Sequence, residues 1–189
     1  MRRSQSRFRI RITAGACIFV ALLLLVLPIQ WVLAIIVAAV FHELCHCCAV
    51  YLCGEELCQI TLGGRGAAME VGSMSRGKEM ICALAGPVGG LTLLLFSKWI
   101  PRVAVCAGVQ SLYNLLPVYP LDGGRALRCG AALLFPQCGD KLCTVLEWIC
   151  LFGVFILAIY AYLCLNLGLL PGLFAVMLLL KRKNTLQRL

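Results

Sequence analysis

The sequence predicts an all-α membrane protein that crosses the bilayer about six times. Of its 189 residues, 62% are hydrophobic and only 13% are charged, whereas soluble domains are about 45–50% apolar and about 25% charged. The apolar residues form long continuous runs, which predict helices, because a membrane β-barrel would alternate apolar and polar positions. We expect one domain over residues 1–189, with a six-span body at 12–180 between basic ends at 1–11 and 181–189.

The basic residues gather at the ends of the apolar runs. The net charge of +9 therefore predicts membrane topology and contacts with the lipid bilayer, and no nucleic-acid partner. With the N-terminus in the cytoplasm and six spans, fifteen of the 17 Lys and Arg residues fall in cytoplasmic segments, and only Lys98 and Arg102 fall outside. The positive-inside rule then places both termini in the cytoplasm.

Two apolar runs follow the basic N-terminus with a short break at Pro28. The first run, Ile12–Ile29, resembles part of a signal peptide, but no small-residue cleavage site precedes Trp31. The second run, Trp31–Cys53, begins at once. We therefore expect a retained first helix, a tight turn at the proline, and a second span.

The second span carries an H-E-x-x-H motif, and its His42 and His46 are the only histidines of the chain. Residues four apart lie on one face of a helix, so both imidazoles can bind one zinc ion, with Glu43 as general base. Glu43 is also the only Asp, Glu, Lys or Arg between Ile12 and Gly54, and such a group is costly in a membrane unless it has a function. The alternative is a hydrogen-bonded pair of core histidines beside a neutral glutamic acid.

The chain has 13 cysteines, which we expect to be reduced thiols that pack as small apolar side chains. Cys45, Cys47 and Cys48 flank the motif and are also soft ligands that could compete for a metal ion. They favour a rival function, that of a non-catalytic membrane protein that binds or handles metal. The intact Glu43 disfavours this rival, because a pure binding site needs no base.

The longest polar interval, 54–78, lies between the second and third spans. Two short alternating runs separated by glycines predict a hairpin or a re-entrant loop there, and a solvated connector is the alternative. An extended substrate segment could add a strand to this region. The third span, Glu79–Phe96, contains Ala85-Gly86-Pro87, where small residues allow close helix approach and the proline predicts a kink.

The fourth span, Val103–Pro117, leads into the segment N-L-L-P-V-Y-P-L-D-G-G-R at 114–125. Its prolines and glycines predict an irregular turn that carries Asp122, on the same membrane side as His46. Catalytic zinc usually has three protein ligands, and because no histidine remains, Asp122 is the best candidate for the third. Asn114 either donates a hydrogen bond to the reacting oxygen or makes an interhelical hydrogen bond.

The remaining chain completes the six spans. Residues 126–135 are too short to cross the membrane and are expected near its surface. Leu142–Leu163 is long enough for a fifth span, and Leu165–Leu180 is a shorter sixth that Pro171-Gly172 interrupts.

Three motifs carry a resemblance to a known family. The sequences HELCH at 42–46, LAGP at 84–87 and NLLPVYPLDGGR at 114–125 resemble those of the site-2 protease family of intramembrane zinc metalloproteases. The resemblance is closest to its compact sporulation branch, that of stage IV sporulation protein FB. We expect the nucleotide-binding domain that follows the last span in that branch to have no counterpart here.

This resemblance implies one zinc ion per chain, bound by His42, His46 and Asp122. It implies that Glu43 is the catalytic base and that Asn114 matches the functional asparagine of the family. The expected enzyme lies in a bacterial cell membrane with its active site toward the cytoplasm. Its expected partners are membrane-tethered regulators, such as a sigma-factor precursor or an anti-sigma factor, and membrane proteins that inhibit or regulate it.

Overall fold

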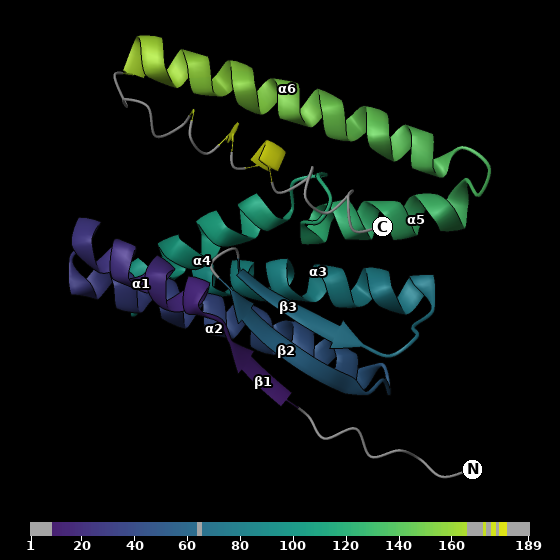
Figure 1. Cartoon of the computed structure of the whole chain (residues 1–189), viewed down its shortest axis with the longest axis horizontal. Coiled ribbons are helices and arrows are strands. Elements are labelled where there is room, and N and C mark those ends of the chain that lie inside the picture. Colours follow the sequence, from purple (N-terminus) through teal and green to yellow (C-terminus); the bar gives the residue numbers. More distant parts are fainter. Residues whose placement is uncertain (1–8, 64–65, 166–171, 173–174, 177, 181–189) are drawn as a thin grey trace. The chain divides into compact units, whose positions relative to one another are not determined.

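The computed structural model describes residues 9–63 and 66–165, together with 172, 175, 176 and 178–180. The chain divides into two compact units, Met1–Tyr113 and Asn114–Leu189. Figure 1 labels the elements of both.

The first unit contains the helices α1 (Ala14–Val26), α2 (Ile29–Leu52), α3 (Arg76–Thr92) and α4 (Pro101–Asn114), with the 3-10 turn η1 (Leu93–Phe96) after α3. Pro28 stands immediately before α2 with φ −57°, and the fixed φ of proline suits a helix start. Past the end of α2, Gly54 adopts φ +72°, a left-handed conformation that glycine takes without steric cost. Local backbone chemistry thus sets both ends of the helix that carries the H-E-x-x-H motif.

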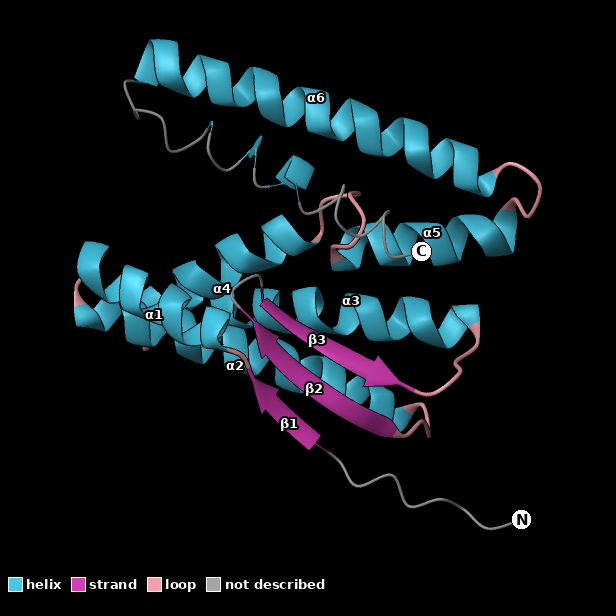
Figure 2. Cartoon of the chain, in the orientation of Figure 1, coloured by secondary structure: helices cyan, strands magenta, loops and turns pink. Residues whose placement is uncertain are grey.

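A three-stranded sheet accompanies these helices (Figure 2). The strands β2 (Leu57–Gly63) and β3 (Gly66–Val71) pair antiparallel, and β1 (Arg9–Ile12) pairs parallel with β2. The chain is mostly helical, as expected, and this small sheet is the departure from an all-α fold. The strand β1 in particular was not predicted, since four residues carry little periodic signal and their partner lies far along the chain.

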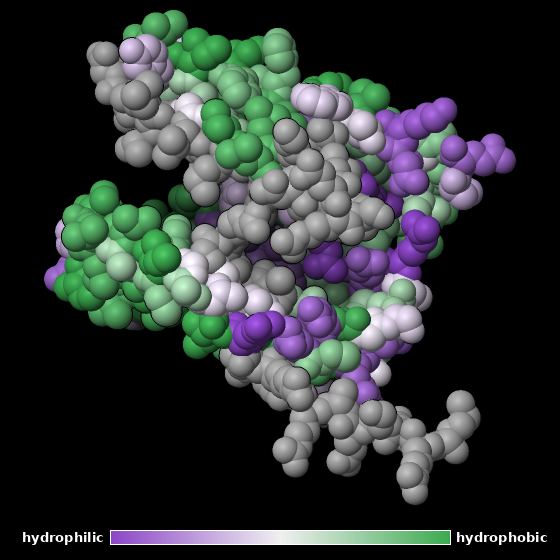
Figure 3. All heavy atoms as spheres, viewed as in Figure 1, coloured by the Kyte–Doolittle hydropathy of each residue, from purple (hydrophilic) through white to green (hydrophobic). Residues whose placement is uncertain are grey.

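Small residues dominate the buried positions of the first unit, and large apolar residues dominate its outside. The fully or almost fully buried side chains of its helices include Val32, Ala34, Ala38, Ala83, Ala104, Ala107 and Ser111. The exposed ones include Ile18, Leu25, Leu33, Val37, Val40, Val105 and Leu112, and Figure 3 shows hydrophobic residues covering α1. This distribution is typical of membrane helices, which pack through small residues and present large apolar side chains to lipid.

The second unit is built around α5 (Asp122–Leu134) and α6 (Gly139–Leu165), which contact each other. Every fourth residue along the first half of α6 is almost fully buried, namely Cys143, Glu147 and Leu151. The opposite face of this helix exposes Val145, Trp148, Phe152, Ile156 and Ile159. Like α2, the helix α6 thus buries one narrow stripe.

The turn before α5 differs from its expectation. Asp122 is not on an irregular turn but is the first residue of α5, whereas Val118–Leu121 form the turn, which includes a cis Tyr119–Pro120 peptide. Gly123 and Gly124 do not end a helix but lie in the first turn of α5, and a Cβ on either would overlap the backbone of the preceding segment. The glycines therefore let the first turn of α5 lie directly against that backbone.

Three helices in the described part of the chain are long and apolar enough to cross a membrane: Ile29–Leu52, Arg76–Phe96 and Gly139–Cys164. They match the second, third and fifth predicted spans. The helix α1 falls within the first predicted span and α4 overlaps the fourth, but they have only 13 and 14 residues. The sixth predicted span, Leu165–Leu180, lies mostly outside the described residues.

Candidate metal centre

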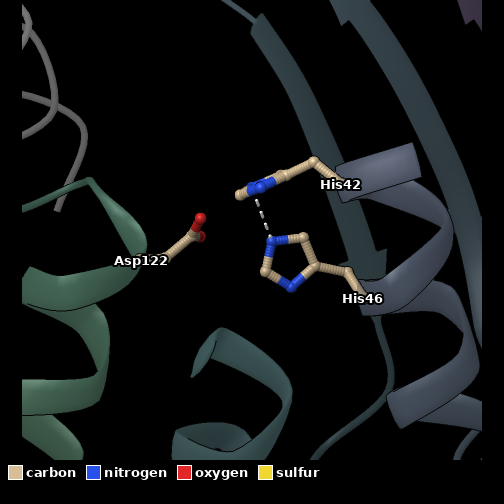
Figure 4. Close-up of side chains that lie close together, drawn as sticks. All are labelled: His42, His46 and Asp122. Atoms are coloured by element: carbon tan, nitrogen blue, oxygen red, sulfur yellow. Dashed lines mark hydrogen bonds between the residues drawn. The ribbon is translucent and has the colours of Figure 1, made fainter. Parts of the chain in front are cut away.

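The two histidines of the motif lie together on the buried face of α2 (Figure 4). Their Nε2 atoms are 3.2 Å apart, and their rings meet edge to face with centroids 4.8 Å apart. Both side chains are buried, with exposed fractions of 2% and 9% for His42 and His46. As the helix period predicts, a spacing of four residues places the two imidazoles on one face of the helix, where their Nε2 atoms converge.

A backbone carbonyl selects the tautomer of His46. Its Nδ1 lies 2.7 Å from the carbonyl oxygen of Cys82 on α3, and a carbonyl only accepts hydrogen bonds, so Nδ1 carries a proton and donates. In the neutral ring, Nε2 then holds a lone pair that faces His42. A metal-binding histidine is usually held in this way by its other nitrogen. Two arrangements fit these converging Nε2 atoms. Either Nε2–H of His42 donates to Nε2 of His46, or both nitrogens bind one metal ion.

The helix α3 approaches the pair through glycine. A Cβ at Gly86 would overlap the imidazole of His46, and a Cβ at Gly89 would overlap the thiol of Cys45. Gly86 belongs to the small-residue stretch of the third span, for which the sequence predicted close helix approach, and Gly89 follows it one helical turn later. The structure adds that the space left by Gly86 is the space that the ring of His46 occupies.

Glu43 is half-buried on the same helix, directly after His42 and three residues before His46. A separation of three residues places Glu43 and His46 on neighbouring positions of the helix surface. The structure thus groups the base and two ligands of the predicted set on one rigid element.

The other two predicted residues belong to the second unit. Asn114 is the last residue of α4 and Asp122 the first residue of α5, and both are half-buried. The positive end of the helix dipole favours an ionised carboxylate in the first turn, which is the form that binds a metal ion. Figure 4 draws Asp122 together with the two imidazoles.

The cysteines around the motif have other neighbours. The thiol of Cys45 lies against Gly89, and that of Cys47 is 4.0 Å from the sulfur of Met69 on β3. Within the described ranges, no cysteine belongs to a group of His, Cys, Asp and Glu side chains suited to a metal ion. These contacts favour the packing role over that of soft ligands.

Sequence reasoning missed the Cys82 carbonyl and the contact of Gly86 with His46. A backbone carbonyl leaves no mark in the residue types, so nothing in the sequence points to it. Gly86 was visible as part of a small-residue stretch, but its partner depends on how α3 packs on α2.

The protein is thus built mainly of apolar helices, and its helix α2 carries paired imidazoles in a metal-binding motif of the zinc-peptidase type. The sequence matches the Peptidase M50B-like family over residues 15–121, which is more than half of the chain. The chain belongs to this family of zinc-dependent membrane proteases.

A solved structure shares the fold. The chain is similar to the site-2 protease from Methanocaldococcus jannaschii, with a TM-score of 0.62 and 20% sequence identity, covering 97% of this chain and 93% of that one. No curated protein sequence matches the chain.

Proposed function

We propose that this protein is an intramembrane zinc endopeptidase whose site consists of His42, Glu43, His46 and Asp122. The observation that carries the proposal is the pair of buried Nε2 atoms, 3.2 Å apart on an apolar helix, in a chain of the Peptidase M50B-like family. The rival, a hydrogen-bonded pair of core histidines, leaves the neighbouring Glu43 without a role.

Asp122 is our choice for the third ligand. Together with His42 and His46 it offers two ring nitrogens and one carboxylate oxygen as donors, a set that zinc accepts. Its place in the first turn of α5 favours the ionised form. The other aspartate, Asp140, lies in the first turn of α6 beside Lys141, where a surface acid is the simpler interpretation.

Each residue then has a defined task in peptide hydrolysis. His42, His46 and Asp122 would hold the ion, which when bound acidifies water and polarises a carbonyl. Glu43 accepts the proton of the attacking water on its carboxylate and delivers it to the departing amide nitrogen. Asn114 either donates its side-chain amide to the reacting oxygen or makes an interhelical hydrogen bond.

The proposed substrates are membrane-tethered regulatory proteins, of the sigma-factor precursor or anti-sigma factor type that the sporulation branch of the family suggests. A substrate helix must unwind before water can reach its peptide bonds, because helical backbone is shielded. In the strand order β1-β2-β3, β1 and β3 are the two edge strands of the described sheet. An unwound substrate segment can pair with such an edge through backbone hydrogen bonds.

We also propose that both termini and the active site lie on the cytoplasmic side of a bacterial cell membrane. Fifteen of the 17 basic residues support this threading. A reporter that works only outside the cytoplasm should be silent when fused after Gly77 and active when fused after Pro101. The opposite pattern contradicts the orientation.

The function is tested by co-expression with tagged single-span membrane proteins in three forms of the full chain: wild type, Glu43→Gln and Glu56→Gln. Glu56 is an exposed acid between α2 and β2 and is the matched control. We expect fragments with the wild type and Glu56→Gln, and none with Glu43→Gln, which should still bind zinc. Undiminished cleavage by Glu43→Gln overturns the mechanism, and zinc binding without cleavage by any form favours the non-catalytic metal-binding rival.

A further inference from the structure

The second unit contains an ion pair that the proposed reaction does not use, in which the carboxylate is buried and the guanidinium is partly exposed. Glu147 on α6 has an exposed fraction of 0%, and its Oε1 accepts hydrogen bonds from Nε and Nη2 of Arg128 on α5, at 3.1 and 2.8 Å. A carboxylate buried in an apolar helix and paired in this way gives little stability compared with apolar residues of the same size. Such a pair therefore calls for an explanation other than stability alone.

The same carboxylate oxygen also holds the turn that precedes Asp122. The backbone N–H of Tyr119 donates to Oε1 of Glu147 at 3.4 Å, and the guanidinium of Arg128 lies over the Tyr119 ring, 4.6 Å from its centroid. The turn, α5 and α6 thus meet at one oxygen atom. A guanidinium can both stack on an aromatic ring and donate to a carboxylate because it is planar.

The chain between this anchor and Asp122 has little freedom. Val118 and Leu121 are buried, with exposed fractions of 1% and 2%, and the N–H of Leu121 donates to the carbonyl of Val118 at 2.8 Å. A Cβ at Gly124 would overlap backbone atoms of Val118 and Tyr119. A shift of the turn at Tyr119 must therefore move the start of α5, which is Asp122.

We propose that Arg128 and Glu147 are positioning residues that fix the carboxylate of Asp122 for its metal ion by anchoring the Val118–Leu121 turn. This inference rests on the proposed function, in which Asp122 is a ligand. Neither residue is assigned a contact with substrate or with the reacting atoms. Their effect passes through the backbone of the turn.

The test measures zinc affinity of the full-length chain, purified in detergent, by competition with a metallochromic chelator, and its thermal unfolding in parallel. Glu147→Gln removes the charge and should weaken zinc binding about 10- to 100-fold, the usual loss when a partner that orients a ligand is removed. Arg128→Lys keeps a point charge without the planar stack and should give a smaller loss. The matched control is Glu55→Gln, which breaks the 2.6 Å ion pair with Lys78 in the first unit and should change zinc affinity less than twofold.

A second set of variants separates positioning from folding. Arg128→Met/Glu147→Leu replaces the pair by apolar residues, which usually preserves the fold, and it should lose zinc affinity while remaining folded. In an Asp122→Asn background, Glu147→Gln should not change the residual zinc affinity of the two histidines. The reason is that Glu147 acts on the metal only through the carboxylate of Asp122, which this background lacks.

The outcomes separate the two proposals. Equal fold-losses from Glu147→Gln in the wild-type and Asp122→Asn backgrounds, or unchanged zinc affinity in folded Glu147→Gln, overturn the positioning role while Asp122 remains a ligand. If Asp122→Asn itself binds zinc like the wild type, the ligand assignment in the proposed function fails first, and the positioning role fails with it.

Discussion

The helices α2 and α6 are both long and apolar, and each buries ionisable side chains. The buried side chains of the two helices differ in their hydrogen-bond partners. In α6, the carboxylate of Glu147 receives a guanidinium and a backbone N–H from its own unit. In α2, Nδ1 of His46 donates to the carbonyl of Cys82, and the Nε2 atoms of His42 and His46 lie 3.2 Å apart. A polar group in an apolar helix is thus structural when a guanidinium and a backbone N–H bind it, and is a candidate metal ligand when two ring nitrogens converge as they do on α2.

The largest effect is expected at Asp122, the proposed third ligand. Asp122→Asn removes the anionic donor and should lower zinc affinity more than about a hundredfold, beyond the loss for a residue that only orients a ligand. Asp140→Asn changes an acid in the first turn of α6 and should retain full metal content. Metal analysis of the purified variants decides between them, and full zinc in Asp122→Asn would move the search for the third ligand to Cys45 or Glu70.

The second-largest loss of zinc affinity is expected when the space beside His46 is filled. Gly86→Ala places a Cβ where the imidazole of His46 lies, so the ring must leave its position, and zinc affinity should fall at least about tenfold. Gly153→Ala on α6 is the control, since a Cβ there meets nothing within 4 Å. In a helix interior, that change should stabilise the protein by up to about 1 kcal/mol. Normal zinc binding by Gly86→Ala would mean that α3 does not hold the ring.

Replacing the cysteines around the motif should have little effect on the metal. Combined Cys45→Ser, Cys47→Ser and Cys48→Ser should change zinc affinity less than twofold, because these thiols contact Gly89 and Met69 or are exposed. Zinc affinity of the triple variant is compared with that of Cys17→Ser, another exposed cysteine. A large loss in the triple variant alone would support the soft-ligand hypothesis.

The smallest effect is expected at Ser111 on α4, whose hydroxyl is fully buried and has no hydrogen-bond partner among the described residues. Ser111→Ala removes a polar group that makes no compensating bond, so unfolding free energy should stay within about 1 kcal/mol of wild type or rise. Glu147→Gln changes a carboxylate that accepts three hydrogen bonds, so it should lower the unfolding free energy more than Ser111→Ala. Thermal unfolding of both variants measures the difference, and a strongly destabilised Ser111→Ala would reveal a partner for the hydroxyl.

Much of this architecture could be predicted from residue types and their spacing. The long apolar runs predict α2, α3 and α6, because about 20 apolar residues are what a membrane-crossing helix needs. The H-E-x-x-H spacing predicts the paired imidazoles, since it depends only on the helix period. Pro28 and Gly54 mark the ends of α2 for equally local reasons.

Other features depend on contacts between distant segments, and only the tertiary structure decides them. The strand β1 exists because β2 supplies its hydrogen-bond partners, and the tautomer of His46 depends on the carbonyl of Cys82. Asp122 begins a helix rather than lying on a turn, and Gly123 and Gly124 after it pack against the backbone of the preceding segment. Glu147 is visible in the sequence as an acid in an apolar run, but its tie to Arg128 and Tyr119 arises only when α5, α6 and the turn pack together.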